Sequence, residues 1–375
     1  MASSNNNGTG FDGDEIPLLP LKFTSPPVGK DEERSIVRFV SAKDDVEASC
    51  VLRGLNGCGV RVAVLDTGID ATHPALRGRI DKAASRNFVQ GGPNDYTDGN
   101  GHGTHCAGII AAENRGAIMY GIAPCATLIA IKIITDNGLT CSKLIVKGIR
   151  HAIAVKADVI SMSFGGKELP GLERFTDSAH EEYQVIQEAL AAGIVIVAAA
   201  GNKGDTSSLN TINPPGAFGG IITVASHDDH FERSEFSSQG GELDFMAPGE
   251  TFSTYARGVP YFGGYDSNNN PIYRPARCYE ALSGTCMACP LIAGLAALLV
   301  QAGRSHSRCL SPVLQERLKL SDFKARNCYE VRELLRSFAD RPEEHHREDG
   351  YGALSSIYRF VKTKVSGAQL TVAEE

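Results

Sequence analysis

The chain has 375 residues, of which 42% are hydrophobic and 22% are charged. This composition is typical of a globular protein and argues against a disordered, fibrous or membrane-embedded one. Its 37 Lys and Arg against 44 Asp and Glu give a net charge of −7 without long single-sign runs, which argues against a surface that follows nucleic-acid phosphates. Ten cysteines are too few for a disulfide scaffold in a chain of this length.

The composition of the first residues predicts an N-terminal extension rather than a folded domain. Its first 14 residues are rich in Asn, Gly and Ser, and they lack the basic start and apolar core of a secretory signal. We therefore expect residues 1–49 to be a partly disordered N-terminal extension and the protein to be cytoplasmic. At the other end, residues 366–375 are expected to form a C-terminal tail.

Apolar runs of strand length alternate with segments of helical period from about residue 59 onwards. This alternation predicts an α/β fold with a mostly parallel central sheet and helices on both faces. The expected strands are Val60–Leu65, Thr127–Ile134, Asp158–Met162, Ile194–Ala199 and Ile221–Val224. The expected helices are Gly103–Glu113, Ser142–Lys156 and Ser178–Ala192.

Three features follow in the second half of the chain. Residues 253–280 are rich in turn formers and are expected to be a long surface loop. The run Cys286–Val300 is almost wholly apolar but shorter than the roughly 20 residues that cross a bilayer, so it predicts a buried helix with Pro290 in its first turn. The charged region 304–347 contains one amphipathic helix, about Tyr329–Phe338, expected to pack on the main domain with its charged face in solvent.

Functional groups in parallel sheets gather where the strands end, at the carboxyl edge. Asp66 directly follows the first expected strand, and Gly201-Asn202 follows the fourth. We therefore expect a site near these residues.

Three short segments carry side chains that together suit acyl transfer. They are Val64-Leu65-Asp66-Thr67-Gly68-Ile69-Asp70, Asn100-Gly101-His102-Gly103-Thr104-His105-Cys106-Ala107-Gly108 and Leu282-Ser283-Gly284-Thr285-Cys286-Met287-Ala288-Cys289-Pro290. Each has an ordinary explanation when taken alone, since a strand-end Asp is often part of a turn, a single His is more often structural, and Gly-Thr-Cys can cap a helix. In the order acid, base, nucleophile, they match the chain order of the subtilisin arrangement. The chain therefore resembles the subtilases, the subtilisin-like serine peptidases.

Further segments support the resemblance, which covers about residues 50–365. Ser161-Met162-Ser163-Phe164-Gly165-Gly166 resembles the substrate-binding strand of the family, and Ala199-Ala200-Gly201-Asn202 resembles its oxyanion segment. Phe245-Met246-Ala247-Pro248-Gly249 resembles the turn before the nucleophile, and Asp349-Gly350-Tyr351-Gly352 resembles the end of the domain. The resemblance implies a three-layer subtilisin-like fold for residues 50–365.

It also implies an endopeptidase that cleaves peptide bonds through an acyl-enzyme. Asp66 would hold the base, His102 would take the proton, position 286 would attack, and the Asn202 side chain would stabilise the oxyanion. The partner would be a peptide or protein substrate, with no nucleic acid and no membrane. The oligomeric state is not readable from the sequence.

Position 286 departs from the family, because Cys stands where the pattern has Ser. Three explanations stay open: a substitution introduced to disable or trap a serine peptidase, a natural thiol-dependent subtilase or transacylase (peptide ligase), and a silent pseudopeptidase that only binds peptides. A thiol at a helix N-terminus beside an imidazole is expected to have a lowered pKa. The larger sulfur is expected to impair amide hydrolysis more than thioester formation and aminolysis.

The second cysteine of Cys286-Met287-Ala288-Cys289 permits two interpretations. A C-x-x-C run at a helix N-terminus favours redox chemistry in other folds, which would allow Cys286 to be locked in a disulfide. The simpler interpretation, which we favour, is that Cys289 is a small buried core residue.

Specificity residues are implied by the resemblance alone. Ser163, Phe164 and Gly165 would bind the extended substrate on one side, and the segment of Gly138 would pair with it on the other. Lys203 would lie near the rim of the primary specificity pocket and Asn213 at its base. We expect a polar pocket that accepts an acidic or amide side chain better than a large aromatic one, although Lys203 can equally be a solvated, screened charge.

No cofactor is expected to be required. The tight calcium site of many subtilases lacks two oxygen ligands here, since Ala75 and Arg115 occupy expected ligand positions, and Arg115 is expected to replace the ion. Weak structural calcium sites elsewhere stay open. His105 is expected to be structural, because the zinc motif H-E-x-x-H would need Glu in place of Gly103.

Overall fold

A computed structural model describes residues 33–38, 52, 54–113, 119–165, 177–204, 211–265, 271–275, 278–304, 314, 316, 327–355 and 359–364. Its centre is a seven-stranded sheet in the order β3-β4-β2-β5-β6-β7-β8, in which every neighbouring pair runs parallel. This confirms the predicted parallel sheet.

Five of the seven sheet strands, β2, β4, β5, β6 and β7, coincide with the predicted apolar runs of the sequence. The seven strands are β2 (Arg61–Asp66), β3 (Arg86–Asn87), β4 (Thr127–Lys132), β5 (Val159–Met162), β6 (Val195–Ala199), β7 (Ile222–His227) and β8 (Phe245–Pro248). Every residue of β5, β6, β7 and β8 is buried, as expected for strands covered on both faces. The short β3 and the strand β8 escaped the sequence prediction.

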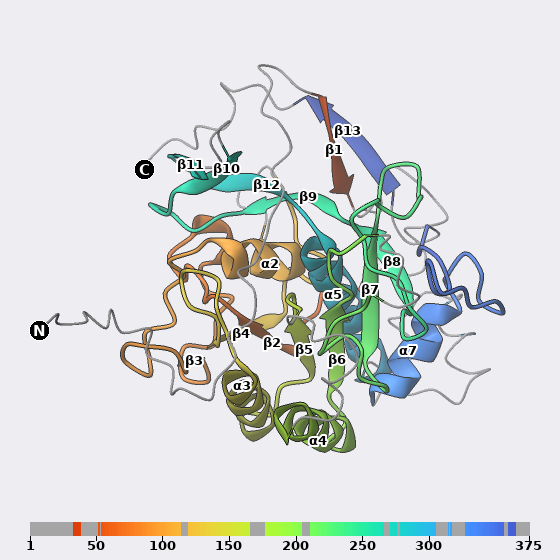
Figure 1. Ribbon diagram of the computed structural model, residues 1–375, viewed down its shortest axis with the longest axis horizontal. Helices are drawn as coiled ribbons and strands as arrows, with labels where there is room; N and C mark the ends of the chain where they lie inside the picture. Colours follow the sequence, from red (N-terminus) through yellow and green to blue (C-terminus); the bar gives the residue numbers. More distant parts are fainter. Residues whose placement is uncertain are drawn as a thin grey trace, which may run out of the picture.

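Helices cover both faces of the sheet and complete three layers (Figure 1). On one face, α2 (His102–Ala111), α5 (Thr285–Arg304) and α7 (Cys328–Arg336) share a core with strand residues such as Val62 and Val64. On the other, α3 (Ser142–Ala154) and α4 (Asp177–Ala191) pack against Ala63 and Leu65. Alternate residues of one strand thus serve two separate cores, which is the period-two geometry of a strand. A short 3-10 helix, η1 (Pro74–Leu76), precedes β3.

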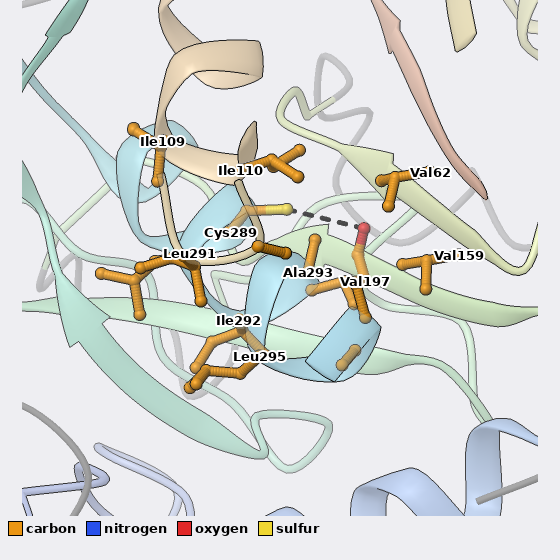
Figure 2. Packing of buried hydrophobic residues seen from close by; sticks show 14 of the residues in the cluster. Val62, Ile109, Ile110, Val159, Val197, Cys289, Leu291, Ile292, Ala293 and Leu295 are labelled. Atoms are coloured by element: carbon orange, nitrogen blue, oxygen red, sulfur yellow. Dashed lines mark hydrogen bonds between the residues drawn. The ribbon is translucent and has the colours of Figure 1, made fainter. Parts of the chain in front are cut away.

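Helix α5 runs through the core beside α2. Among the described residues it is the one helix long and apolar enough to cross a membrane, yet 89% of that apolar window is buried inside the protein. Figure 2 shows its side chains, among them Leu291 and Ile292, packed among residues of α2 and the sheet. The predicted buried helix is therefore confirmed.

The expected place of Pro290 was wrong. Because α5 begins at Thr285, Pro290 is its sixth residue and lies inside the helix rather than in its first turn. Proline has no N–H, so it cannot donate to the carbonyl four residues earlier, which is that of Cys286. The Sγ of Cys106, 3.6 Å away, donates to this carbonyl instead.

The expected surface loop at 253–280 was also wrong. The chain there forms β9 (Glu250–Thr254), β10 (Tyr261–Tyr265), β11 (Pro271–Arg274) and β12 (Tyr279–Ser283), with β10 antiparallel to β11 and β9 antiparallel to β12. Arg274 donates to both carboxylate oxygens of Glu280 at 2.8 and 2.7 Å and lies 4.0 Å from the ring centre of Tyr261. Long-range pairing and this ion pair outweigh the turn-forming composition.

A two-stranded sheet joins segments from near the two ends of the chain. Strand β1 (Glu33–Arg38) is antiparallel to β13 (Arg359–Lys364), with Glu33 opposite Lys364. Figure 1 shows this pair above the main sheet. The division into 1–49, 50–365 and 366–375 stays a prediction, although β1 gives part of the first segment a strand partner in the second.

Candidate active site

The carboxyl edge of the sheet gathers the segments singled out in the sequence. Asp66 is the last residue of β2, Ser163 follows the adjacent β5, and Asn202 follows β6, the next strand across. Since these strands are parallel, their ends meet at one edge. The first residue of α2, His102, reaches the same edge and contacts Asp66.

Asp66 and His102 form a buried hydrogen-bonded pair. The Nδ1 of His102 donates to Oδ1 of Asp66 at 2.7 Å, and both side chains are at most 1% exposed. The same oxygen accepts from the N–H of Thr67 at 2.7 Å. The pair therefore fixes the imidazole with its Nε2 turned away from the carboxylate.

The charge of Asp66 controls the basicity of His102. Burial alone would lower the pKa of His102, but the charge and hydrogen bond of Asp66 outweigh it and hold that pKa well above its ordinary 6.5. Cys106 also lies against the ring, with Sγ 3.8 Å from Nε2. Burial raises the pKa of Cys106 to about 11, so it is a neutral thiol at pH 7 and we assign the effect on His102 to Asp66.

A second buried carboxylate, Asp98, ties the end of β2 to the start of α2. Its Oδ1 accepts from the hydroxyl of Thr67 and from the N–H groups of Asn100 and Gly101, at 2.8 to 3.0 Å. Its Oδ2 accepts from both the N–H and the hydroxyl of Thr104. An anionic group at a helix N-terminus is favourable, and here it holds the backbone on both sides of His102. The sequence signal was an Asp four residues before a helix start, which we overlooked.

Gly101 allows the ring of Tyr255 to pack closely against the backbone just before His102. Its φ is +101°, and a Cβ on it would lie 2.2 Å from the ring of Tyr255. The hydroxyl of Tyr255 donates to the carbonyl of Asn100 at 2.9 Å. The loop before His102 is thus held between Asp98 and Tyr255.

Cys286 is the second residue of α5 and is 5% exposed. Gly284, which precedes the helix, has a φ of +153°, a conformation that other residues rarely adopt. The thiol of Cys106 donates to the backbone carbonyl of Cys286, as described above. Because Cys106 lies one turn beyond His102, it links the helix of the histidine to the first turn of α5. Cys106 belongs to the sequence segment that contains His102, but its contact with the carbonyl of Cys286 depends on Pro290 and was not predicted.

Asn202 caps α5 with one end of its amide. Its Oδ1 accepts from the N–H and the hydroxyl of Thr285, at 2.9 and 3.0 Å. Since the oxygen is held by Thr285, the NH2 group faces the other way, and a Cβ on Gly284 would lie 3.1 Å from it. The residue is exposed, so the two N–H bonds are available beside the nucleophile segment.

The residues expected to bind substrate lie around this edge. Ser163 and Phe164 are buried, and the hydroxyl of Ser163 faces the thiols of Cys106 and Cys289. Gly165 and Gly201 both contact the side chain of Asn213, whereas Lys203 is partly exposed. Gly138 is buried in a tight turn, its N–H donating to the carbonyl of Thr135 at 2.9 Å. Their contacts with substrate stay a prediction.

His105 and Cys289 have structural surroundings. The Nε2 of His105 donates to the carbonyl of Glu280 at 3.1 Å, and burial together with the charge of His102 lowers the pKa of His105 to about 3. The Sγ of Cys289 donates to the carbonyls of Val197 and Met162 at 3.5 and 3.6 Å (Figure 2 shows the first of these). Burial raises the pKa of Cys289 to about 12. Both observations favour core roles over zinc binding and over a reactive C-x-x-C pair.

Two metal sites can be weighed from the residues present. The ligand atoms of Asp66, His102 and Cys106 lie within 4.8 Å of one another. However, the 2.7 Å contact of Asp66 and His102 leaves space for a proton only, and the Sγ of Cys106 is nearly equidistant from both ring nitrogens, at 3.8 and 3.9 Å. That equidistance places the sulfur away from the lone-pair direction of Nε2. The geometry favours proton transfer over metal binding.

The family's calcium site does not fit the residues that the structure describes. The side chain of Ala75 has no oxygen, and its backbone carbonyl accepts from the N–H of Glu113. The Nδ1 of His73 accepts from the N–H of Ala75, and its Nε2 donates to the carbonyl of Cys278. A calcium ion needs about six to eight oxygens. Arg115, expected to replace the ion, lies outside the described residues.

Comparison with known proteins agrees with the fold described above. Residues 57–352 match the subtilase family. The chain belongs to the subtilases. It is 38% identical to subtilisin DY of Bacillus licheniformis over 249 residues, which are 66% of this chain and 79% of that protein.

Other subtilases extend the comparison. The chain is 36% identical to subtilisin E of Bacillus subtilis over 71% of its own length, and it spans 61% of the length of that protein. It is 36% identical to an intracellular serine protease of Paenibacillus polymyxa, over 75% of this chain and 78% of that one. Among solved structures, a cold-adapted subtilisin-like serine proteinase superposes with a TM-score of 0.58 at 24% identity, over 80% of this chain and 89% of that one, and supports the subtilase fold.

Proposed function

We propose that this subtilase is an endopeptidase that cleaves peptide bonds through a covalent acyl-enzyme on Cys286. The observation that carries the proposal is the buried 2.7 Å pair of Asp66 and His102 beside the start of α5. A base of raised pKa, held in one orientation by a carboxylate, is what activation of a nucleophile requires. A structural His has no need of that arrangement, as the neutral His105 shows by contrast.

The chemistry assigns one step to each group. His102 takes the thiol proton as Sγ of Cys286 bonds to the substrate carbonyl carbon, and Asp66 stabilises the resulting imidazolium. The NH2 of Asn202 and the N–H of Cys286 donate to the oxyanion. The C–N bond then breaks, His102 returns the proton to the leaving amine, and a thioester remains. Water resolves the thioester in a peptidase, and a second amine resolves it in a transacylase.

The competing function is that of a silent pseudopeptidase that binds peptides without acylation. The favourable surroundings of Asp66, His102 and Asn202 support the enzyme, because a protein that only bound peptides would gain nothing from a base of raised pKa. We further propose a peptide or protein partner, no required cofactor and a cytoplasmic setting, the last in line with the name of the Paenibacillus relative.

Intact mass measurement after treatment with an activated peptide ester tests the proposal. We expect the mass of one acyl group on the protein and on the Cys289→Ala variant, and none on Cys286→Ala. Bound peptide without acylation would identify a pseudopeptidase. Acylation of the Cys286→Ser variant alone would mean that Cys286 disables a serine peptidase.

The raised pKa of His102 predicts an alkaline activity profile. In the Cys286→Ser variant the base must be neutral to accept the hydroxyl proton, so kcat/KM should rise with pH as His102 loses its proton. We expect the midpoint well above pH 6.5, measured with a peptide anilide between pH 5 and 10. The added substitution Asp66→Asn should move the midpoint down, since burial alone lowers this pKa. Full activity at pH 6 would contradict the assignment.

A further inference from the structure

Asn213 lies between the two segments that flank the proposed peptide site. Its backbone N–H donates to the carbonyl of Ala200, and its own carbonyl accepts from the N–H of Ala217. A Cβ on Gly165 would lie 3.3 Å from the Cβ of Asn213, and a Cβ on Gly201 would lie 3.3 Å from its Nδ2. The side chain therefore touches the chain that follows β5 and the chain that follows β6.

The side chain of Asn213 is buried, and its amide oxygen is unpaired among the described residues. The residue is 5% exposed, and the unpaired atom is Oδ1. Asn202 is different, because two donors of Thr285 satisfy its oxygen. A buried polar atom without a partner costs stability, which a protein tolerates where a ligand supplies the partner.

We infer that Asn213 selects substrates whose side chain, at the residue that is acylated, ends in a carboxamide. This inference rests on the proposed function. Whichever way the side-chain amide of Asn213 is turned, its C=O group can accept a hydrogen bond and its NH2 group can donate one. A carboxamide of Gln or Asn offers the matching donor and acceptor, whereas a carboxylate only accepts, an ammonium or guanidinium only donates, and an apolar group does neither.

Two other substrate classes are less well matched. A large aromatic side chain would need the space between Gly165 and Gly201 that Asn213 occupies. An acidic side chain could be attracted by Lys203, but that residue is partly exposed, where solvent and salt screen its charge. The buried amide therefore discriminates between substrates more strongly than the partly exposed Lys203, so of the acidic and amide substrate side chains expected from the sequence only the amides are favoured.

Competition among peptide esters that differ only at the acylated residue tests the inference. The set carries Gln, Asn, Glu, Leu, Phe or Ala at that residue, and kcat/KM is measured for each. We expect the better of the two amides to exceed Glu and Leu by about tenfold or more, because a site built for hydrogen bonds rejects analogues that lack them. Phe should be poorer than Leu.

Three variants test whether the preference for carboxamide substrates arises from the amide of Asn213. Asn213→Leu keeps the branched shape and the number of side-chain heavy atoms and removes both polar groups, so the ratio of amide to Leu substrates should fall at least tenfold. Asn213→Asp removes the donor and should reduce the same preference by a smaller factor. Asn94→Leu, at an exposed asparagine remote from the pocket, should change no ratio.

The Ala ester distinguishes failure of the inference from failure of the proposed function, because Ala is too short to reach the amide of Asn213. If the Ala ester acylates Cys286 and no amide preference exists, or Asn213→Leu leaves that preference intact, the inference is wrong and the proposed function stands. If no ester acylates, the proposed function is wrong. Fluorescence titration of the same peptides against Cys286→Ala then decides, and equal affinity for Gln, Glu and Leu peptides would overturn the inference.

Discussion

Asp66→Asn is expected to lower kcat for peptide anilides about 10⁴-fold while KM stays within a few-fold. The Oδ1 of Asp66 accepts from Nδ1 of His102 at 2.7 Å in a buried setting, so its charge acts at short range. An amide can still accept from the N–H of Thr67, but it carries no charge to stabilise the imidazolium. Steady-state kinetics on the protein with a peptide thioester, and on the Cys286→Ser variant with an anilide, measure the effect.

A carboxylate that contacts the other end of β2 provides the control. Asp81 accepts from Arg61, the first residue of β2, at 2.9 Å. Asp81→Asn removes a partly exposed ion pair and should leave kcat within about twofold, since such pairs contribute little. A loss below tenfold for Asp66→Asn would mean that Asp66 does not stabilise the charged base.

Asn202→Leu is expected to lower kcat by about 10²- to 10³-fold with little change in KM, the scale known for one oxyanion donor in subtilisin. The expectation follows from the way Thr285 holds Oδ1 at 2.9 and 3.0 Å and thereby directs the NH2 group toward Gly284 and the helix start. The effect should lie in kcat, because the oxyanion exists only in the transition state.

Two further variants separate the donor from the cap. Asn202→Asp keeps an oxygen for Thr285 and removes the N–H donors, so it should retain thermal stability and lose activity. Thr285→Val removes one of the two groups that hold the amide oxygen and should reduce kcat by a smaller factor, about tenfold. A rise in KM at constant kcat in Asn202→Asp would show that Asn202 binds the substrate ground state instead.

The sequence was sufficient for those parts of the fold in which local pattern and burial agree. The strands ending at Asp66 and Ala199 are continuous apolar runs because both faces of the sheet are covered, and helices separate them at regular distances. In the region 253–280 pattern and structure disagree. Its glycines and asparagines favour turns, and its strands depend on contacts such as Arg274 with Glu280 and the hydroxyl of Tyr261 with the carbonyl of Ala281.

In the candidate site, the residues expected to take part in acyl transfer could be predicted from the sequence. The residues that hold them in place could not. Asp66 and Asn202 were placed at the carboxyl edge from strand ends and His102 was assigned from the resemblance, and the structure brings Asp66 and His102 into contact. Asp98 was missed because its role depends on Thr67, 31 residues earlier in the chain. The contact of Cys106 with the carbonyl of Cys286 spans 180 residues and exists only because Pro290 lies inside α5. Such contacts are set by tertiary structure.

The order of the site residues along the chain also determines when the site becomes complete during synthesis. The acid and the base belong to the early part of the chain, and the 180 residues between Cys106 and Cys286 take roughly 10 to 35 s to translate at about 5 to 20 residues per second. Throughout that time the emerging chain carries a general base but neither the nucleophile nor the helix that Asn202 caps. In the proposed mechanism, a chain that has not yet reached Cys286 therefore cannot cleave its neighbours, and translation itself delays the reactive state until α5 has been made.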